Sequence, residues 1–246
     1  MRNRRQIIFH CAVAALYCAA LALAFADAGD APRYEFRRDH DEDGTGKFYM
    51  GREIAQVMGP AGIPWLERGT REQDEQSTQM LIALGLRGGE TVVDFGAGSG
   101  YYTFRLAEIV GPKGTVLAVD IEPKMLEFIR RRAAQQGLTN VGLLQSTASD
   151  PRLPINRVDL VLMVDVYHEL EFPYEVLRKI RDSLKPDGRV ALVEFRLEDP
   201  SVPIKLLHKM SEAQIIKEMN AVGFIHLETI GTLPLQHLVL FGKASP

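Results

Sequence analysis

The sequence predicts an α/β protein built on one doubly wound, mostly parallel sheet with an antiparallel end. Three observations predict this class. Apolar strand patterns alternate with amphipathic helical patterns from residue 91 to residue 242, a glycine-rich turn follows the first strand pattern, and the last two strand patterns are joined by a turn too short for a crossover helix. The 246 residues, 46% apolar and 25% charged, provide one ordinary core and a modest extension.

The expected elements follow one another at regular intervals. The expected strands are residues 91–95, 115–120, 141–145, 158–164, 189–195, 224–230 and 235–242, which makes a seven-stranded sheet. The expected helices are residues 101–110, 123–136 and 174–184, and a last helix that begins at the capping box Ser211-x-x-Gln214. Residues 158–164 form a nearly unbroken apolar run, which is typical of a strand covered on both faces. Residues 185–188 are expected to form a turn.

Residues 1–26 have the pattern of a signal peptide. Arginines among the first five residues precede an uncharged run over residues 7–26, which ends in the small-residue pattern Ala24-x-Ala26 that signal peptidase accepts. A periplasmic or secreted location is therefore expected, with the alternative that residues 7–26 remain as a membrane anchor. Both cysteines, Cys11 and Cys18, lie in this leader, so a processed chain has no thiol for a disulfide, a thiolate metal site or a nucleophile. No metal is expected.

The remaining chain divides by composition into three parts. Residues 27–50 are polar and charged with no apolar period, and a flexible lead-in is expected there. Residues 51–86 have a helical pattern interrupted by Gly and Pro, which predicts an N-terminal helical cap. Residues 87–246 carry the alternation and form the main domain.

A glycine-rich loop and an acidic residue predict a nucleoside site. The loop Gly96-Ala97-Gly98-Ser99-Gly100 joins the first strand to a helix, where bare backbone lets a ligand approach the free N–H groups. A dinucleotide fingerprint starting at Gly96 requires Gly or Ala at position 101, which is Tyr101, so a diphosphate is disfavoured. Asp120 ends the next strand, where a carboxylate can accept the hydroxyls of a ribose.

With these motifs the sequence resembles the class I S-adenosylmethionine-dependent methyltransferases, which have a Rossmann-like sheet. Residues 93–100 are similar to their first motif, Val119-Asp120 to their ribose-binding acid, residues 159–165 to their fourth strand, and residues 184–189 to the turn before their fifth strand. The resemblance covers residues 72–242 and departs at Asp187, where the family has glycine.

The resemblance implies S-adenosylmethionine as cofactor and a set of residues that bind it. Glycines of the loop line its methionine part, Asp94 holds its amino group through water, Asp120 binds the ribose and Ile121 packs on the adenine. The usual adenine-binding acid is replaced by Thr147, which leaves open whether Asp150 substitutes. The full implied set is Asp94, Gly96, Ala97, Gly98, Gly100, Asp120, Ile121, Thr147, Ala148 and Asp165.

The acceptor is expected beyond the end of the fourth strand, at residues 165–169, because ligands of open α/β sheets bind at the carboxyl ends of strands. His168 is the first candidate for a general base, with a packing role as the alternative, and Tyr167 is the candidate for a pocket wall or hydrogen-bond donor. Glu169 is expected to be a solvated acid at the start of a helix, with orientation of His168 as the alternative. Trp65 either lines the pocket or fills the core, and residues 197–210 form a candidate substrate lid.

Charge and composition narrow the choice of acceptor. The net charge of -3 provides no broad basic surface for nucleic acid. A small organic acceptor is the first prediction and a protein side chain the second. A third alternative is an exported module that binds S-adenosylmethionine without catalysis. Contact with a membrane is expected only through an uncleaved leader.

Overall fold

The computed structural model describes residues 33–244, and contacts divide the chain into two units after residue 35. The architecture below is that of the second unit. The predicted leader over residues 1–26 lies outside the described residues. Within residues 33–244, none of the helices has the length and apolar character needed to cross a membrane.

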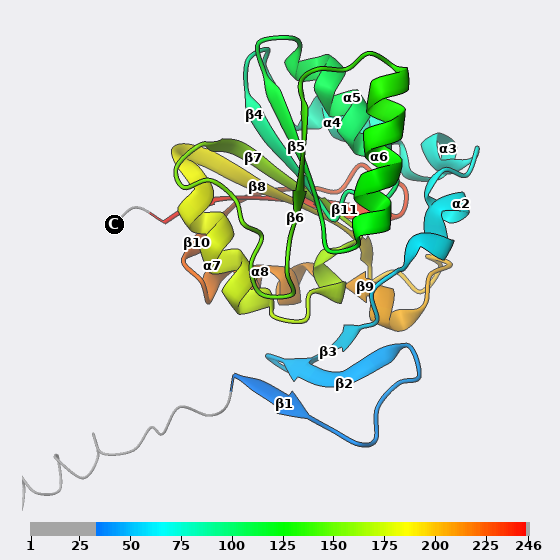
Figure 1. Cartoon of the computed structure of the whole chain (residues 1–246). Helices are drawn as coiled ribbons and strands as arrows, with labels where there is room; N and C mark the ends of the chain where they lie inside the picture. The colour runs from blue at the N-terminus through cyan, green and yellow to red at the C-terminus, as the bar shows by residue number, and fades with distance from the viewer. Residues whose placement is uncertain (1–32, 245–246) are drawn as a thin grey trace, which may run out of the picture. The chain divides into compact units, whose positions relative to one another are not determined.

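The centre of the second unit is a sheet in which the strands run in the order β10-β11-β8-β7-β4-β5-β6, and β9 pairs with β8 (Figure 1). The strands β4 to β8 pair in parallel, whereas β11 is antiparallel to both of its neighbours, β8 and β10. The strands are β4 (Thr91–Phe95), β5 (Thr115–Asp120), β6 (Val141–Gln145), β7 (Val158–Val164), β8 (Leu184–Arg196), β9 (Lys209–Met210), β10 (Phe224–Ile230) and β11 (Gln236–Lys243).

Helices connect these strands and cover the sheet. Proline at a first position begins both α6 and α7, as its fixed φ favours, and the Ser211 hydroxyl accepts from the Gln214 N–H at 3.1 Å to cap α8. The helices are α2 (Ile63–Leu66), α3 (Arg71–Glu75), α4 (Ser77–Ala83), α5 (Tyr101–Val110), α6 (Pro123–Gln135), α7 (Pro173–Ser183) and α8 (Glu212–Asn220), with 3-10 turns η1 (Pro60–Gly62), η2 (Tyr167–Glu169) and η3 (Leu206–His208).

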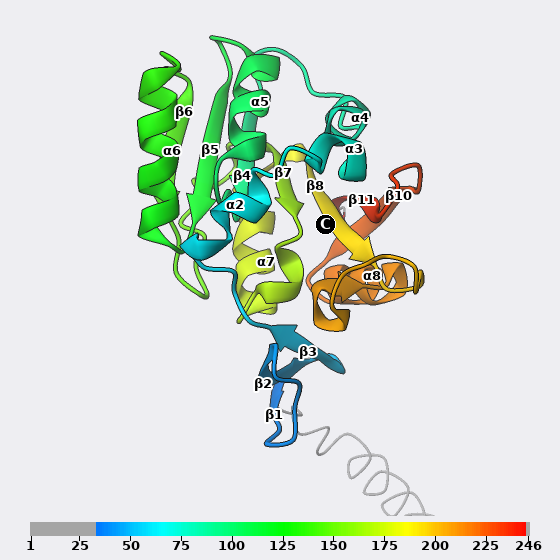
Figure 2. The ribbon, with the colours of Figure 1, turned by 90° about the vertical axis from the view of Figure 1, so that its right-hand side faces the viewer.

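The core lies on both faces of the sheet because successive strand residues point to opposite sides. Val93 and Val161 belong to the cluster with α7 and α8, whereas Val92 and Leu160 belong to the cluster with α4 and α5. A smaller cluster joins α5 and α6 to β5, and Figure 2 shows these two helices beside β5 and β6. Burial on both faces explains the continuous apolar run of β7.

The predicted fold class is confirmed, and the observed strands match the predicted ranges closely. Two details differ. The expected turn over residues 185–188 is the beginning of the long strand β8, and the two-residue β9 adds a strand to the seven expected.

The N-terminal part differs more from the expectation. Residues 34–36 form β1 (Tyr34–Phe36), and residues 44–55 form an antiparallel pair, β2 (Gly44–Tyr49) and β3 (Arg52–Ala55), in place of the expected lead-in and the first turn of the helical cap. The pair is held by a distant partner, since the Arg52 guanidinium donates to both oxygens of buried Glu218 at 2.9 and 3.0 Å. No local sequence pattern reports such a contact.

Candidate active site

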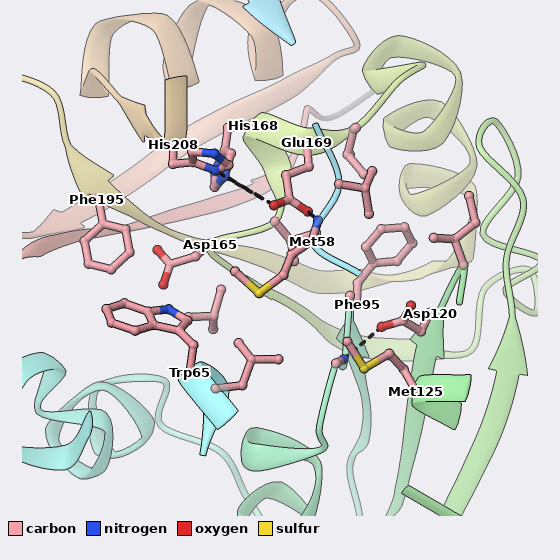
Figure 3. Close-up of a pocket in the computed structure, with 18 of the residues that line it drawn as sticks. Met58, Trp65, Phe95, Asp120, Met125, Asp165, His168, Glu169, Phe195 and His208 are labelled. Carbon is pink, nitrogen blue, oxygen red and sulfur yellow. Dashed lines mark hydrogen bonds and ion pairs between the residues drawn. The ribbon is translucent and has the colours of Figure 1, made fainter. Parts of the chain in front are cut away.

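A cavity of about 500 Å³ opens where four central strands end (Figure 3). Its lining includes Phe95 and Asp120, the last residues of β4 and β5, and also Val164 and Phe195 from β7 and β8. Leu66 of α2 contributes to the wall from the predicted cap. The cavity therefore occupies the position expected for a ligand of an open α/β sheet.

The glycine loop after β4 requires glycine for two separate reasons. Gly96, Gly98 and Gly100 have φ values of 71°, 54° and 82°, in the left-handed region that disfavours side chains. A β-carbon would lie 2.3 Å from Val166 at Gly96 and 2.8 Å from Leu66 at Gly98. The loop thus presents bare backbone to the cavity directly before α5 begins.

Asp120 is fixed between this loop and the start of α6. Its Oδ2 accepts from the Gly98 N–H at 2.8 Å, its Oδ1 accepts from the Glu122 N–H at 2.8 Å, and only 8% of the residue is exposed. Burial raises the pKa of this carboxyl. A carboxylate offers about four acceptor sites, so two remain for the hydroxyls of a ligand.

Asp165, directly after β7, carries an unsatisfied buried acceptor. Its backbone is left-handed, with φ of 53°, and its Oδ2 accepts from the Gln236 side chain at 2.8 Å. The Oδ1 atom is buried and has no hydrogen-bond partner within residues 33–244. Burial, followed by the charges of Glu75 and Glu194, raises the pKa of Asp165 well above its ordinary value. A cationic ligand group bound beside it would satisfy this oxygen.

A cluster of His168, Glu169 and His208 lies on one side of the cavity and Asp120 on another (Figure 3). The Nδ1 atom of His168 bonds to Glu194 at 2.6 Å, and its Nε2 atom lies 3.0 Å from His208 Nδ1. Burial lowers the pKa of His168, but the charge of Glu194 and its hydrogen bond outweigh burial, so the net pKa lies above the ordinary value. Burial raises the pKa of Glu169 to about 7.

The structure brings most of the predicted site residues to this cavity. The lining includes Gly96, Gly98, Asp120, Ile121, Thr147, Ala148, Asp165 and His168. Ala97 and Gly100 shape the loop without lining the cavity, and Asp150 pairs with Lys179 outside it. Asp94 is also away from the lining: it accepts from the Thr103 hydroxyl at 2.5 Å, and burial raises its pKa to about 6.

Two expectations about the acceptor end require correction. Tyr167 is fully buried, and its hydroxyl donates to Glu218 at 2.8 Å, so it neither lines the cavity nor faces an acceptor. Glu169 is 9% exposed, because the 3-10 turn η2 directs it inward, where its Oε2 accepts from the Met58 N–H at 3.2 Å. Trp65 lines the cavity with 47% of its surface exposed and does not fill the core.

Further lining residues had no recognisable sequence signal. They are Val57, Met58, Arg71, Glu75 and Met125. Arg71 and Glu75 form a buried pair on α3 with a separation of 2.9 Å. Their spacing of four residues is common on ordinary solvated helices, so it does not indicate a site.

The fold and the Asp120 carboxylate beside a bare loop define a nucleoside-binding α/β protein. The methyltransferase-domain family matches residues 86–230, and the chain belongs to this family. Ubiquinone/menaquinone biosynthesis C-methyltransferase UbiE of Ectopseudomonas mendocina is 35% identical over 112 residues, 45% of this chain and 44% of the relative. Aklanonic acid methyltransferase DauC of a Streptomyces species is 38% identical over 105 residues, 42% of this chain and 47% of the relative. The chain spans about half the length of these curated relatives.

Solved structures agree with this family. A SAM dependent methyltransferase from Aquifex aeolicus has a TM-score of 0.71 and 26% identity, and the match covers 75% of this chain and 98% of that one. The carbon methyltransferase CurJ shares the fold alone, with a TM-score of 0.60 and 14% identity over 76% of this chain and 62% of that one. Family membership and the Aquifex structure imply that the chain binds S-adenosylmethionine, which confirms the predicted cofactor.

The residues present fit this cofactor. Asp120 has free acceptor positions for ribose hydroxyls, Gly96 and Gly98 line the cavity without side chains, and the orphaned Asp165 Oδ1 matches an ammonium group. Ile121 and Met125 supply an apolar surface for the adenine.

Proposed function

We propose that this chain is an S-adenosylmethionine-dependent methyltransferase that acts on a small organic acceptor. The observation that carries the proposal is the continuity of one cavity, which contains both the nucleoside-binding groups and the buried His168 cluster. A cofactor held at Asp120 would therefore share this cavity with a molecule held beside His168.

The chain's own residues would act mainly by positioning. S-adenosylmethionine, when bound, supplies the methyl group together with a good leaving group. Asp120 fixes the ribose and Asp165 the amino group, while Met58 and Phe195 provide apolar walls that exclude water. Alignment of this kind supplies several kcal/mol of a displacement barrier, about 7–11 kcal/mol in the most favourable cases.

The histidine supplies a proton acceptor for the molecule to be methylated. A carboxylate can only accept, so Glu194 holds the proton on His168 Nδ1 and leaves the Nε2 lone pair directed away from it. Nε2 lies 3.0 Å from His208 Nδ1, so it can remove a proton from an acidic O–H or C–H group once His208 turns away. The mostly apolar surroundings favour a small aromatic or conjugated acceptor over a charged one.

The names of the relatives support a small acceptor, since one is named for ubiquinone and menaquinone biosynthesis and another for aklanonic acid. The net charge of -3 argues against a nucleic-acid substrate.

The proposal extends to location and domain organisation. We propose that residues 1–26 direct export to the periplasm or outside the cell, and that any membrane contact is made only by an uncleaved leader. Residues 51–86 act as a cap, which is supported by the contribution of Leu66, Arg71 and Glu75 to the cavity. Fractionation of expressing cells and the N-terminal mass of the purified protein test this, and a cytoplasmic chain with an intact leader would contradict export.

Calorimetric titration with S-adenosylmethionine and S-adenosylhomocysteine tests the function, followed by a panel of phenolic, enolic and quinol acceptors. We expect one binding site for each cofactor form and methyl transfer to at least one acceptor. Absence of binding to both forms rejects the proposal. Cofactor binding without methyl transfer to any acceptor would favour the binding module. Methyl transfer to a protein, and to none of the small acceptors, would favour the protein methyltransferase.

A further inference from the structure

Three side chains in the cavity bring their ligand atoms to one point. His168 Nε2 lies 3.0 Å from His208 Nδ1 and 3.8 Å from Glu169 Oε1, and His208 Nδ1 lies 3.9 Å from the same carboxylate oxygen. Of the histidine, cysteine and carboxylate side chains within residues 33–244, these three are spaced closely enough to share a metal ion. The residues come from η2 and η3, two turns that follow β7 and β8.

The separations suit a first-row transition metal. In the plane of these three atoms, the point equidistant from them lies about 2.1 Å from each. This is the distance of Zn²⁺ from histidine nitrogen and carboxylate oxygen. The separations of 3.8 and 3.9 Å are too long for direct hydrogen bonds, so the carboxylate meets the histidines only as an ion pair when they are protonated.

The surroundings resemble those of a protein-bound metal. His168 is 1% exposed and bonds through Nδ1 to Glu194, which is fully buried and also accepts from the Tyr167 N–H at 2.7 Å. A carboxylate behind a ligating histidine fixes the tautomer that leaves Nε2 free to bind the ion. Glu169 is likewise oriented by the Met58 N–H.

We propose that His168, Glu169 and His208 bind one divalent transition-metal ion, with Zn²⁺ as the ion best matched to this donor set. Three protein ligands leave an open coordination position, and all three residues line the cavity, so that position faces the acceptor. This is a site additional to that of S-adenosylmethionine.

A role for the ion rests on the proposed function. An ion at this position would bind a hydroxyl or enol oxygen of the acceptor and lower its pKa, so that the O–H proton is lost to solvent and the electron pair stays on oxygen. In the metal-bound state His168 acts as a ligand, and the ion takes over the activation assigned above to the histidine.

Metal binding is tested on the untagged full chain without S-adenosylmethionine. Equilibrium dialysis against Zn²⁺ should give one ion per chain, and Co²⁺ should produce a visible absorption spectrum. His208→Ala is the main variant, because this side chain is 24% exposed on a short turn and its loss leaves the core intact. His226→Ala, an exposed histidine on β10, is the matched control.

We expect His208→Ala to abolish stoichiometric binding and the Co²⁺ spectrum, Glu194→Gln to weaken binding about 10- to 100-fold, and His226→Ala to change neither. Unfolding curves of each variant verify the fold. Absence of stoichiometric metal in the wild-type chain, or equal binding by His208→Ala, overturns the proposal and leaves a proton shared between the two histidines. If the chain binds the metal but transfers no methyl group, the proposed metal site stands and the proposed function fails. Failure of the metal site can therefore be told apart from failure of the proposed function.

Discussion

Replacement of Asp120 by asparagine tests the cofactor site with the smallest change of shape. The carboxylate is 8% exposed and uses one oxygen for the Gly98 N–H and the other for the Glu122 N–H. Asparagine retains one acceptor but places an N–H₂ group where the second accepting oxygen was, and it removes the charge. The ribose hydroxyls then lose charge-assisted hydrogen bonds.

The expected loss follows from those bonds. Hydrogen bonds to a charged group contribute about 1.5–3 kcal/mol, so the dissociation constant of S-adenosylhomocysteine should rise about 10- to 150-fold. Asp120→Ala should weaken binding at least as much and also lower stability by about 1–3 kcal/mol, because it leaves two backbone N–H groups without their acceptor.

Isothermal titration calorimetry measures the affinity, and urea unfolding verifies that each variant is folded. Asp159→Asn is the matched control, since Asp159 also accepts a backbone N–H, that of Thr91 at 2.8 Å, but near the opposite end of the strands. Wild-type affinity in a folded Asp120→Asn variant, or an equal loss in Asp159→Asn, would refute the assignment of Asp120 to the ribose.

Three further predictions concern single residues. Gly98→Val should abolish cofactor binding, because its β-carbon would lie 2.8 Å from a leucine, whereas Gly137→Ala, also left-handed but unobstructed, should retain binding in the same titration. Asp94→Asn should raise the free energy of unfolding above pH 7 by on the order of 3 kcal/mol, because burial raises the Asp94 pKa to about 6 and the charged form is the unfavourable one. The gain in the free energy of unfolding should shrink as the pH falls through 6 towards 4. If urea unfolding shows an equal gain at pH 4 and above pH 7, burial of the charged carboxylate is not its cause. Tyr167→Phe should cost about 1.5–3 kcal/mol of stability through the lost bond to the Glu218 carboxylate and leave methyl-transfer turnover unchanged; a tenfold loss of turnover in a folded variant would return Tyr167 to the site.

The parts of the fold that sequence predicted are those determined by local chemistry. Glycine in a left-handed turn, proline at the start of α6 and the continuous apolar run of β7 are each visible within a few residues. The position of Asp120 follows from the same local signals, because it is the last residue of a strand beside the glycine loop.

The features that sequence missed depend on contacts between distant residues. The strand β3 is held in place by the hydrogen bonds of Arg52 to Glu218, which lies 166 positions further along the chain. The side chain of Tyr167 points into the core because its hydroxyl donates to the same glutamate. His168 and His208 are 40 positions apart and meet only because the segments after β7 and β8 converge at one end of the sheet. No spacing in the sequence encodes that meeting.

A crystal structure of the chain with S-adenosylhomocysteine would test the central claim most directly. We predict that both ribose hydroxyls lie within hydrogen-bond distance of Asp120, with the amino group at Asp165 Oδ1 and the sulfur in the same cavity as His168. A nucleoside bound elsewhere, or a ribose that Asp120 does not contact, would contradict the account.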